Sequence, residues 1–333
     1  MAAVWRRLLG RKIISRSDDF FELGGNSLAA VRLVAMLRKE MHAQLQVADV
    51  FTSPVLSSLA AVVAKGAAPR KEAIVLQAAG ARIALHSLSA GPRFRNLAHC
   101  FAPERPVLAL PAPDLKELTH PCRCEDLAAR YAEWLMTAHP GGPWVLTGWC
   151  MAGVVAFEAA RLLAAHGPGA VVLLDSPCPE QNRSQPPLQR LARSARNLAY
   201  HGRVILSGRH GGLAPYLRER IATLQDQRTL RAFEKRYQVV SSDEQGFEFQ
   251  DVLNFAASRY APGGPLPWPV LLLRAEERAH DREKRGDWGW GPYAPRLDVA
   301  WSEGDHGTIF EAPYVSKSAR LIRDWLDRIP EIS

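Results

Sequence analysis

The sequence predicts two domains, a small all-α bundle of four helices followed by a larger α/β domain with a mostly parallel sheet. Residues 1–65 repeat apolar side chains at helical spacing. From residue 74 onward, short continuous apolar runs alternate with helical stretches, which is typical of a parallel sheet covered on both faces. Between them, residues 66–73 are small or charged with Gly and Pro, as expected of a linker that lets the first domain swing.

Composition limits the classes of function. With 47% apolar and 23% charged residues in 333, the chain has the composition of a globular protein. It has no apolar run of membrane-spanning length and no secretion-like leader, so we expect a cytoplasmic protein without a membrane partner. The window from Gln181 to Tyr237 contains eleven arginines and one lysine but only three acidic residues, and this excess accounts for the net charge of +8. Without a nucleic-acid motif, this excess indicates solvated helix faces or attraction of an anionic substrate, and no nucleic-acid partner.

The cysteines predict neither a metal site nor a disulfide framework. Their number, five, is odd, and they lack paired ligand spacing. We interpret them as reduced thiols, and we expect no metal. They are Cys100, Cys122, Cys124, Cys150 and Cys178.

The first domain contains a serine in a specific context. Helical patterns cover residues 4–9, 28–41 and 55–63, and Ser27 stands before the second of them, behind Gly24 and Gly25. A serine at a helix start is commonly an N-cap. Here, however, the string from Asp19 to Leu28 resembles the phosphopantetheine attachment motif of peptidyl carrier domains. That resemblance implies that a phosphopantetheinyl transferase attaches 4'-phosphopantetheine to Ser27, at a helix end that favours phosphate.

The second domain places reactive residues after its predicted strands. The apolar runs are residues 74–76, 83–86, 107–110, 144–146, 171–174, 270–273 and 297–300. Cys150 follows the fourth run, Asp175 the fifth and His306 the last. In open parallel sheets the chemistry lies at the strand carboxyl ends. The order nucleophile, acid, histidine is that of α/β-hydrolases, so we expect this fold.

Cys150 stands where such a fold carries its nucleophile. An apolar strand, a tight turn at Gly148 and a helix start predict an elbow that presents the thiol to helix amides. The fifth motif position is Ala152 instead of glycine, so the match is imperfect. We expect His306 to accept the thiol proton and Asp175 to orient the imidazole. Asp305 is the alternative acid. We expect it less than Asp175, because the side chain of the residue next to His306 is poorly placed to orient the imidazole ring.

An acyl-transfer site also needs amides that bind the oxyanion. The Met151 N–H at the helix start is the first expected donor. The second should come from the loop after the second strand, with Leu88 as the first choice and Ser89 as the alternative.

Residues 74 to about 330 together resemble the type I thioesterase domain that ends nonribosomal peptide synthetases. The resemblance is strongest at Gly148 to Cys150, at Leu174 to Ser176 and at Gly304 to His306, and it departs at Ser89, Ala90 and Cys150. It implies a mobile helical lid at about residues 177–262, a peptidyl substrate on the phosphopantetheine arm, a carrier–thioesterase contact and upstream synthetase domains as partners.

The cysteine suggests what is released. An acyl group that moves from a carrier thioester to Cys150 remains a thioester and keeps its transfer potential, and the thiolate is accessible near neutral pH. In the family that the chain resembles, cysteine here is associated with strained rings, so we expect release of a β-lactone or β-lactam after attack by a β-hydroxyl or β-nitrogen. The alternatives are an ordinary hydrolytic or macrocyclising thioesterase and, more remotely, a catalytically weak docking module.

Overall fold

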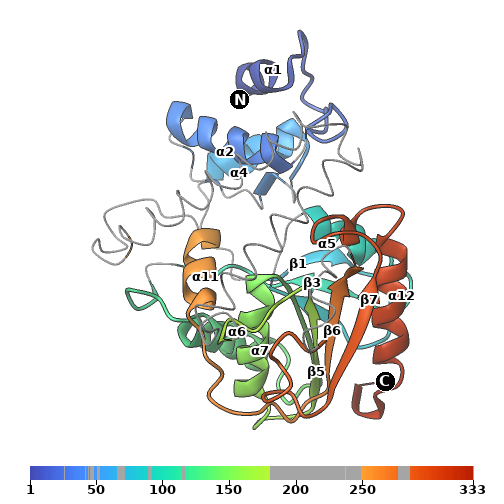
Figure 1. The fold of residues 1–333 in the computed structure, drawn as a ribbon. Coiled ribbons are helices and arrows are strands. Elements are labelled where there is room, and N and C mark those ends of the chain that lie inside the picture. The colour runs from blue at the N-terminus through green and yellow to red at the C-terminus, as the bar shows by residue number, and fades with distance from the viewer. Residues whose placement is uncertain are drawn as a thin grey trace, which may run out of the picture.

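The computed structural model describes two successive parts of the chain, one helical and one α/β (Figure 1). The described residues are 1–25, 27–41, 43, 45, 49–50, 53–65, 72–88, 92–114, 117–180, 237, 249–276 and 286–332. Most of the expected linker and most of the expected lid, with its arginine-rich window, lie outside these residues.

The first part holds three helices within the described residues. They are α1 (Ala2–Leu9), α2 (Ser27–Met41) and α4 (Leu56–Lys65). Their apolar faces surround Trp5 and Phe20, which are fully buried and meet edge to face with ring centroids 5.1 Å apart. The Phe20 N–H donates to the Pro54 carbonyl, and this bond ties the loop before α2 to the start of α4. The fourth helix of the bundle stays a prediction.

The second part is built on a seven-stranded sheet in the order β1-β3-β2-β4-β5-β6-β7. The strands are β1 (Ile74–Gln77), β2 (Leu85–Ser87), β3 (Val107–Ala109), β4 (Trp144–Trp149), β5 (Gly169–Leu174), β6 (Val270–Ala275) and β7 (Leu297–Ser302). All neighbouring pairs are parallel except β1 with β3. The predicted mostly parallel sheet is confirmed. The seven predicted runs each fall on a strand, with ends displaced by up to three residues.

Helices cover both faces of this sheet (Figure 1). On one face α6 (Cys124–Ala138), α7 (Met151–Leu163) and α11 (Phe249–Ser258) share a core with β4 and β5. On the other face α5 (Pro92–His99) and α12 (Val315–Leu326) close a second core, near the short helices η3 (Thr308–Phe310) and η4 (Pro330–Ile332). β4 and β5 are buried along nearly their whole length, which is why the sequence reads as continuous apolar runs there.

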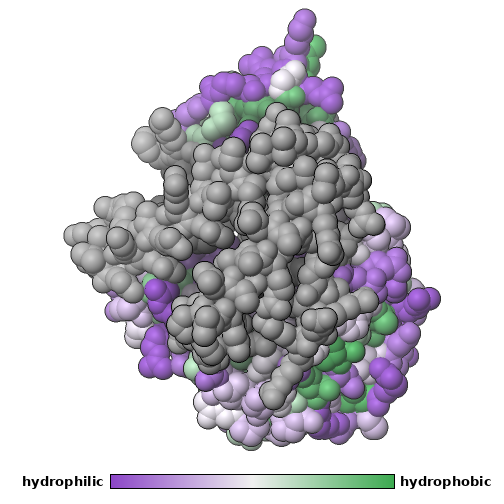
Figure 2. Space-filling view, viewed as in Figure 1, coloured by the Kyte–Doolittle hydropathy of each residue, from purple (hydrophilic) through white to green (hydrophobic). Residues whose placement is uncertain are grey.

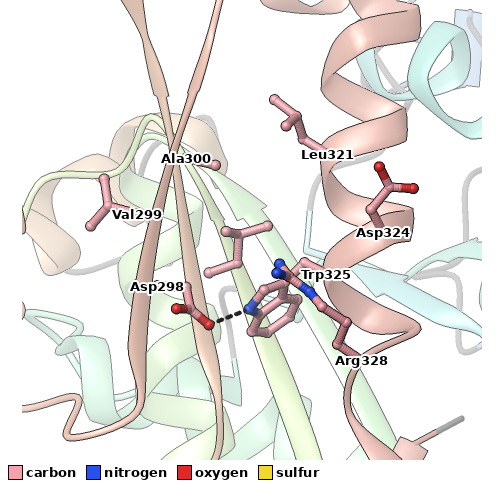
Figure 3. A pocket seen from close by; sticks show the side chains of 8 residues that line it. Asp298, Val299, Ala300, Leu321, Asp324, Trp325 and Arg328 are labelled. Atoms are coloured by element: carbon pink, nitrogen blue, oxygen red, sulfur yellow. Dashed lines mark hydrogen bonds between the residues drawn. The ribbon is translucent and has the colours of Figure 1, made fainter.

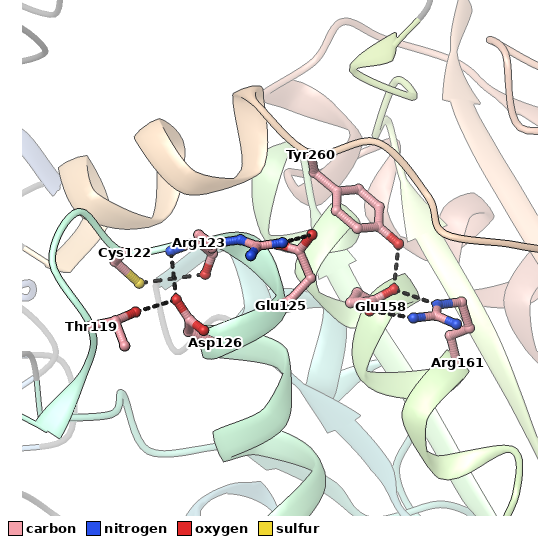
Figure 4. A network of polar contacts seen from close by, with 8 residues as sticks. All are labelled: Thr119, Cys122, Arg123, Glu125, Asp126, Glu158, Arg161 and Tyr260. Atoms are coloured by element: carbon pink, nitrogen blue, oxygen red, sulfur yellow. Dashed lines mark hydrogen bonds and ion pairs between the residues drawn. The ribbon is translucent and has the colours of Figure 1, made fainter.

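A buried carboxylate ties α7 to the segment after α11 (Figure 4). Glu158 is 1% exposed and accepts two hydrogen bonds from the Arg161 guanidinium, at 2.7 and 2.9 Å. The Tyr260 hydroxyl donates to the same carboxylate. Burial, followed by the Glu158 carboxylate, raises the pKa of Tyr260, so the phenol keeps its proton. The carboxylate is paired and fully bonded, as a charge in this position must be.

His86 is a buried histidine in the middle of β2. It is 2% exposed, and neither ring nitrogen has a well-oriented hydrogen-bond partner within the described part of the chain. The ring of His139, at the C-terminal end of α6, lies 5.2 Å away between centroids. Burial and then His139 lower the pKa of His86 from 6.5 to about 4, although the backbone at Val145 works in the opposite direction. His86 is therefore neutral in the folded protein near neutral pH.

Mild acid should destabilise the fold through His86. The His86 imidazole takes up a proton near pH 6.5 in the unfolded chain and only near pH 4 in the folded one. Its contribution to the free energy of unfolding is therefore fully present above pH 6.5 and decreases as the pH falls from 6.5 to 4. From pH 6.5 to 5 we expect the free energy of unfolding, measured by urea titration, to fall by about 2 kcal/mol. His86→Leu should lose most of this slope, and His166→Gln, at an exposed histidine, should keep it. Equal slopes in His86→Leu and the wild type would contradict the assignment.

The flank of the sheet at β7 carries a cleft that is separate from the reactive residues. Hydrophobic side chains gather in the region of Figure 2 where Figure 1 draws β6 and β7, and Val299 is 37% exposed. A cleft of about 450 Å³ opens here between β7 and α12, and the Trp325 indole donates to Asp298 within it at 2.7 Å (Figure 3). None of the candidate site residues lines this cleft. Among the helices described, none has the length and apolarity to cross a membrane.

Candidate active site

The turn between β4 and α7 is a strained elbow with Cys150 at its tip. Cys150 has φ 54° and ψ −123°, a backbone conformation that residues other than glycine rarely adopt. Its N–H donates to the Leu174 carbonyl at 3.0 Å, which anchors the tip to the end of β5. The residue is partly exposed. Such a turn lifts a nucleophile above the carboxyl edge of the sheet, in front of the helix N-terminus.

Two glycines make this elbow possible, and the sequence motif identifies only one of them. A Cβ at Gly148 would lie 2.5 Å from the Ala152 carbonyl, so the strand and helix could not approach as they do. A Cβ at Gly153 would lie 2.1 Å from the Ser176 hydroxyl oxygen. Ala152 is itself accommodated at 3% exposure. The close approach to the segment after β5 falls on Gly153, one residue beyond the expected fifth position, and this explains why the imperfect motif still forms the turn.

Asp175 and His306 are brought together from distant parts of the chain. Asp175 follows β5, is fully buried, and accepts a hydrogen bond from the Ala275 N–H at 3.1 Å through Oδ1. Its Oδ2 lies 2.5 Å from Nδ1 of His306, in the loop after β7. The His306 side chain is 23% exposed while that of Asp175 is covered. A carboxylate held on Nδ1 leaves Nε2 as the nitrogen that can accept a proton.

The alternative acid Asp305 has a different structural role. Its Oδ1 accepts hydrogen bonds from the amides of Gly307, at 2.8 Å, and Thr308, at 2.9 Å, in the turn that leads into η3. Burial acts to raise the pKa of Asp305, but these bonds and the neighbouring His306 outweigh burial and lower it. Asp305 thus stabilises the turn that presents His306, while Asp175 holds the ring.

The two expected oxyanion donors differ in their surroundings. Met151 is the first residue of α7, so its N–H is among the amides that have no acceptor within the helix. The Leu88 N–H instead donates to the Thr147 carbonyl at 3.0 Å, continuing the β2–β4 ladder. In this conformation the Leu88 amide is therefore committed to the sheet, and using it for an oxyanion would require that bond to be exchanged. The alternative, Ser89, lies outside the described residues.

Sequence reasoning did not single out Trp149, which precedes the candidate nucleophile. Its indole N–H donates to the His306 carbonyl at 3.0 Å, and the indole and imidazole centroids are 4.6 Å apart. Because Trp149 adjoins Cys150 in the chain, this contact places His306 beside the elbow. An aromatic residue inside the motif was the only available signal, and it did not reveal a partner 157 residues away.

The environments of the other thiols set them apart from Cys150. Burial raises the pKa of Cys122 to about 12 and holds that of Cys124 well above its ordinary value, and Cys178 is fully buried. Only Cys100 shares partial exposure with Cys150. Since the thiolate is the reactive form, Cys100 is the relevant comparison for Cys150 in labelling experiments. In the described residues, His, Cys, Asp and Glu side chains form no group of three or more that could hold a metal ion.

The predicted attachment serine opens α2 after a constrained loop. The helix begins at Ser27, and Gly24 has φ 99°. The Gly25 N–H donates to the Phe20 carbonyl at 2.9 Å, and a Cβ at Gly25 would collide with the Phe20 ring at 2.4 Å. The chain therefore turns tightly around a buried phenylalanine before the helix start. A serine at a helix N-terminus fits a phosphate-linked group, because the first amides of the helix point toward the phosphate.

Comparison with known proteins agrees with this geometry. Residues 85–326 match the family model of the thioesterase domain. The chain belongs to this thioesterase family. Residues 1–63 match the model of the phosphopantetheine attachment site, so a carrier domain precedes the thioesterase. The cofactor is covalently attached 4'-phosphopantetheine.

The relatives of this carrier–thioesterase chain are large synthetases. Nonribosomal peptide synthetase imqB of Aspergillus flavus is 25% identical over 360 residues, covering 98% of this chain and 11% of the relative. Surfactin synthase subunit 3 of Bacillus subtilis is 30% identical over 171 residues, covering 50% and 13%. Malpibaldin synthetase of Mortierella alpina is 30% identical over 177 residues, covering 50% and 3%. The chain thus spans between 3% and 13% of these relatives.

A solved structure shares the fold. The crystal structure of a holo four-domain nonribosomal peptide synthetase bound to AMP and glycine has a TM-score of 0.56 and 24% identity. The match covers 99% of this chain and 26% of that one. The likeness therefore includes both the carrier domain and the thioesterase domain.

Proposed function

We propose that this chain performs terminal release of a nonribosomal peptide. In this proposal the acyl group passes from the phosphopantetheine thioester on Ser27 to Cys150. A β-hydroxyl or β-nitrogen of the terminal residue then attacks the thioester, and a β-lactone or β-lactam leaves. The observation that carries the proposal is that His306, paired with Asp175, contacts the residue next to Cys150 at the elbow. The same chain matches the model of the phosphopantetheine attachment site.

The chain's own residues account for the proton movements. The arm supplies a thiol that presents the acyl group as a thioester. His306 takes the Cys150 proton on Nε2, and the Cys150 sulfur attacks the acyl carbonyl. Asp175 keeps the ring in the required tautomer and stabilises its positive charge. The Met151 N–H is directed at the oxyanion, and His306 returns the proton to the departing thiolate.

In the second step the roles repeat with a different nucleophile. His306 accepts the proton of the attacking β-hydroxyl or β-nitrogen, and the bond from the acyl carbon to the Cys150 sulfur breaks. The proton then returns to the Cys150 thiolate, which restores the starting state. Since the first transfer exchanges one thioester for another, the acyl group keeps its activation for closing a strained ring. Water would compete for the same thioester, so a dry site is needed for this product.

The decisive experiment loads the arm of the full chain with a dipeptide that ends in a β-hydroxy or β-amino residue. Mass spectrometry and an authentic standard then identify the released compound. We expect the four-membered ring as the main product. A linear acid or a macrocycle as the main product would contradict ring closure and support the ordinary thioesterase. A matched dipeptide that lacks the β-heteroatom serves as the control and should give only the linear acid.

A docking role without catalysis is tested by thiol labelling. If Cys150 is the nucleophile of the release reaction, iodoacetamide should modify Cys150 faster than Cys100, and His306→Ala should remove that difference. Peptide mass spectrometry distinguishes the two sites. If Cys150 reacts no faster than Cys100, or if His306→Ala has no effect, the nucleophile assignment is wrong.

An electrostatic attraction between the domains is a further part of the proposal. Arg95 on α5 lies within electrostatic range of Asp19, in the loop before Ser27. Burial lowers the pKa of Arg95, and the Asp19 carboxylate opposes this effect. Asp19 Oδ1 also accepts from the Phe21 N–H at 2.8 Å, so an asparagine there would keep the turn while removing the charge. We propose that this pair helps to seat the carrier on the thioesterase.

A double-mutant cycle tests this attraction. Asp19→Asn and Arg95→Gln should each slow transfer from the loaded arm several-fold, and the double variant should be no slower than either single variant. All three should process a soluble thioester at the wild-type rate, because that substrate needs no carrier. Losses that add in the double variant would show that the two residues act separately.

A further inference from the structure

Trp149 contacts His306 in two ways that are independent of Asp175. Its indole N–H donates to the His306 main-chain carbonyl at 3.0 Å, which fixes the loop. Its ring lies over the imidazole with centroids 4.6 Å apart and planes inclined by 32°. The indole is itself held in place by Phe310, whose ring meets it nearly at right angles at 5.6 Å and is 1% exposed. The aromatic face toward His306 is therefore rigidly presented.

The charged and titratable groups near His306 come from three elements. Asp175, at the end of β5, bonds Nδ1 and favours the imidazolium. Asp305, in the same loop, also interacts electrostatically with His306. Cys150, next to Trp149 in the elbow, is the proposed proton donor. Trp149 differs from all three because it carries no charge at any pH. Its ring face can nevertheless attract a cation whose centre lies within about 6 Å.

We propose that Trp149 is a positioning residue of the release reaction, which fixes the His306 loop and stabilises the imidazolium formed when Cys150 loses its proton. This inference rests on the proposed function, because it needs the Cys150–His306 pair. The proton moves from the Cys150 sulfur to Nε2 of His306, leaving a thiolate and an imidazolium. The indole face lowers the free energy of the imidazolium more than that of the neutral ring, so it favours the charged pair.

The arrangement explains why an aromatic residue precedes the nucleophile. The elbow sets the direction of Cys150, and the adjacent side chain reaches across to the loop after β7. The Trp149–His306 pair, whose members are 157 residues apart in the chain, thus links the nucleophile to its base. An aliphatic side chain at position 149 would fill space but would supply neither the N–H donor nor the cation-binding face.

The test is the pH dependence of Cys150 alkylation by iodoacetamide in the full chain, read by peptide mass spectrometry. The quantity compared between variants is the pH at which Cys150 alkylation reaches half its maximal rate, called the midpoint. Trp149→Leu should raise it by about half a pH unit or more. Trp149→Phe, which keeps a ring face, should raise it less. Trp134→Leu is the matched control, since Trp134 meets another histidine, His139, far from the elbow, and it should leave the midpoint unchanged.

The outcomes separate this inference from the proposed function. If Trp149→Leu has the wild-type midpoint while His306→Ala does not, Trp149 is only a space-filling residue and the inference is wrong. If His306→Ala also has the wild-type midpoint, the Cys150–His306 pair itself is wrong. If Trp149→Leu does not fold, NMR titration of His306 in Trp149→Phe decides. The imidazole midpoint should then lie below that of the wild type, and an unchanged midpoint would overturn the inference.

Discussion

Replacement of Cys150 by alanine should abolish release, with a loss of about 10³-fold or more in the single-turnover rate from the loaded arm. The thiol is the proposed attacking atom, and the remaining elbow offers no other nucleophile at that point. Cys150 also sits at φ 54°, so the substitution leaves the backbone strain of the turn nearly unchanged. Quenched-flow sampling with product analysis by mass spectrometry measures the loss. Release at the wild-type rate would eliminate Cys150 as nucleophile and favour the docking module.

Serine at the same position gives a sharper comparison. Cys150→Ser keeps a nucleophile of similar size but converts the intermediate from a thioester into an oxoester, which is less activated. We expect this variant to accumulate acyl-enzyme and to lose ring formation by a larger factor than it loses hydrolysis. Intact-mass analysis detects the accumulated species. If the ratio of ring to linear acid is the same as in the wild type, the chemistry of sulfur is not what directs closure.

Much of the fold could be predicted because its central strands are buried on both faces. β4 and β5 lie in the middle of the sheet, so their residues are apolar in continuous runs and are visible without structural information. Apolarity does not encode strand direction, however. β1 pairs antiparallel with β3 at the edge of the sheet, and the sequence there resembles the parallel strands. The comparisons confirm a carrier domain and a thioesterase domain, because residues 1–63 and 85–326 match the two family models.

The site was less predictable because its contacts join remote segments. Asp175 and His306 are 131 residues apart, and chain order alone suggested their pairing. The Leu88 amide illustrates the limit, since the sequence indicates the right loop but cannot reveal that this N–H is bonded to Thr147. The role of Gly153 was hidden because it depends on Ser176, in the segment that follows the neighbouring strand β5. Local motifs predict which residues belong to the site. Which of their backbone amides are left to bind a substrate depends on contacts with other segments, and the sequence does not show these.

Replacement of Ser27 by alanine should eliminate attachment of the arm completely. Ser27 is the first residue of α2 and supplies the hydroxyl that the phosphate would esterify. After incubation with a phosphopantetheinyl transferase and coenzyme A, the intact mass of the Ser27→Ala chain should stay unchanged, while that of the wild type should rise by one arm. Ser58→Ala is the matched control, since Ser58 is an exposed helical serine of the same domain, and it should still take the arm. A mass increase in Ser27→Ala would place the attachment at another residue.

Assaying the Ser27→Ala variant with a soluble substrate separates the role of the carrier arm from that of the acyl-transfer step. A thioester of N-acetylcysteamine reaches the elbow without the carrier, so Ser27→Ala should process it at the wild-type rate, although the same variant releases nothing from an arm. Cys150→Ala should fail with both substrates. The two variants would then show opposite dependence on tethering, as expected if Ser27 raises the local concentration of the acyl group and Cys150 performs the transfer. If Ser27→Ala also fails with the soluble thioester, Ser27 contributes more than a tether, and the division of labour between the two domains is wrong.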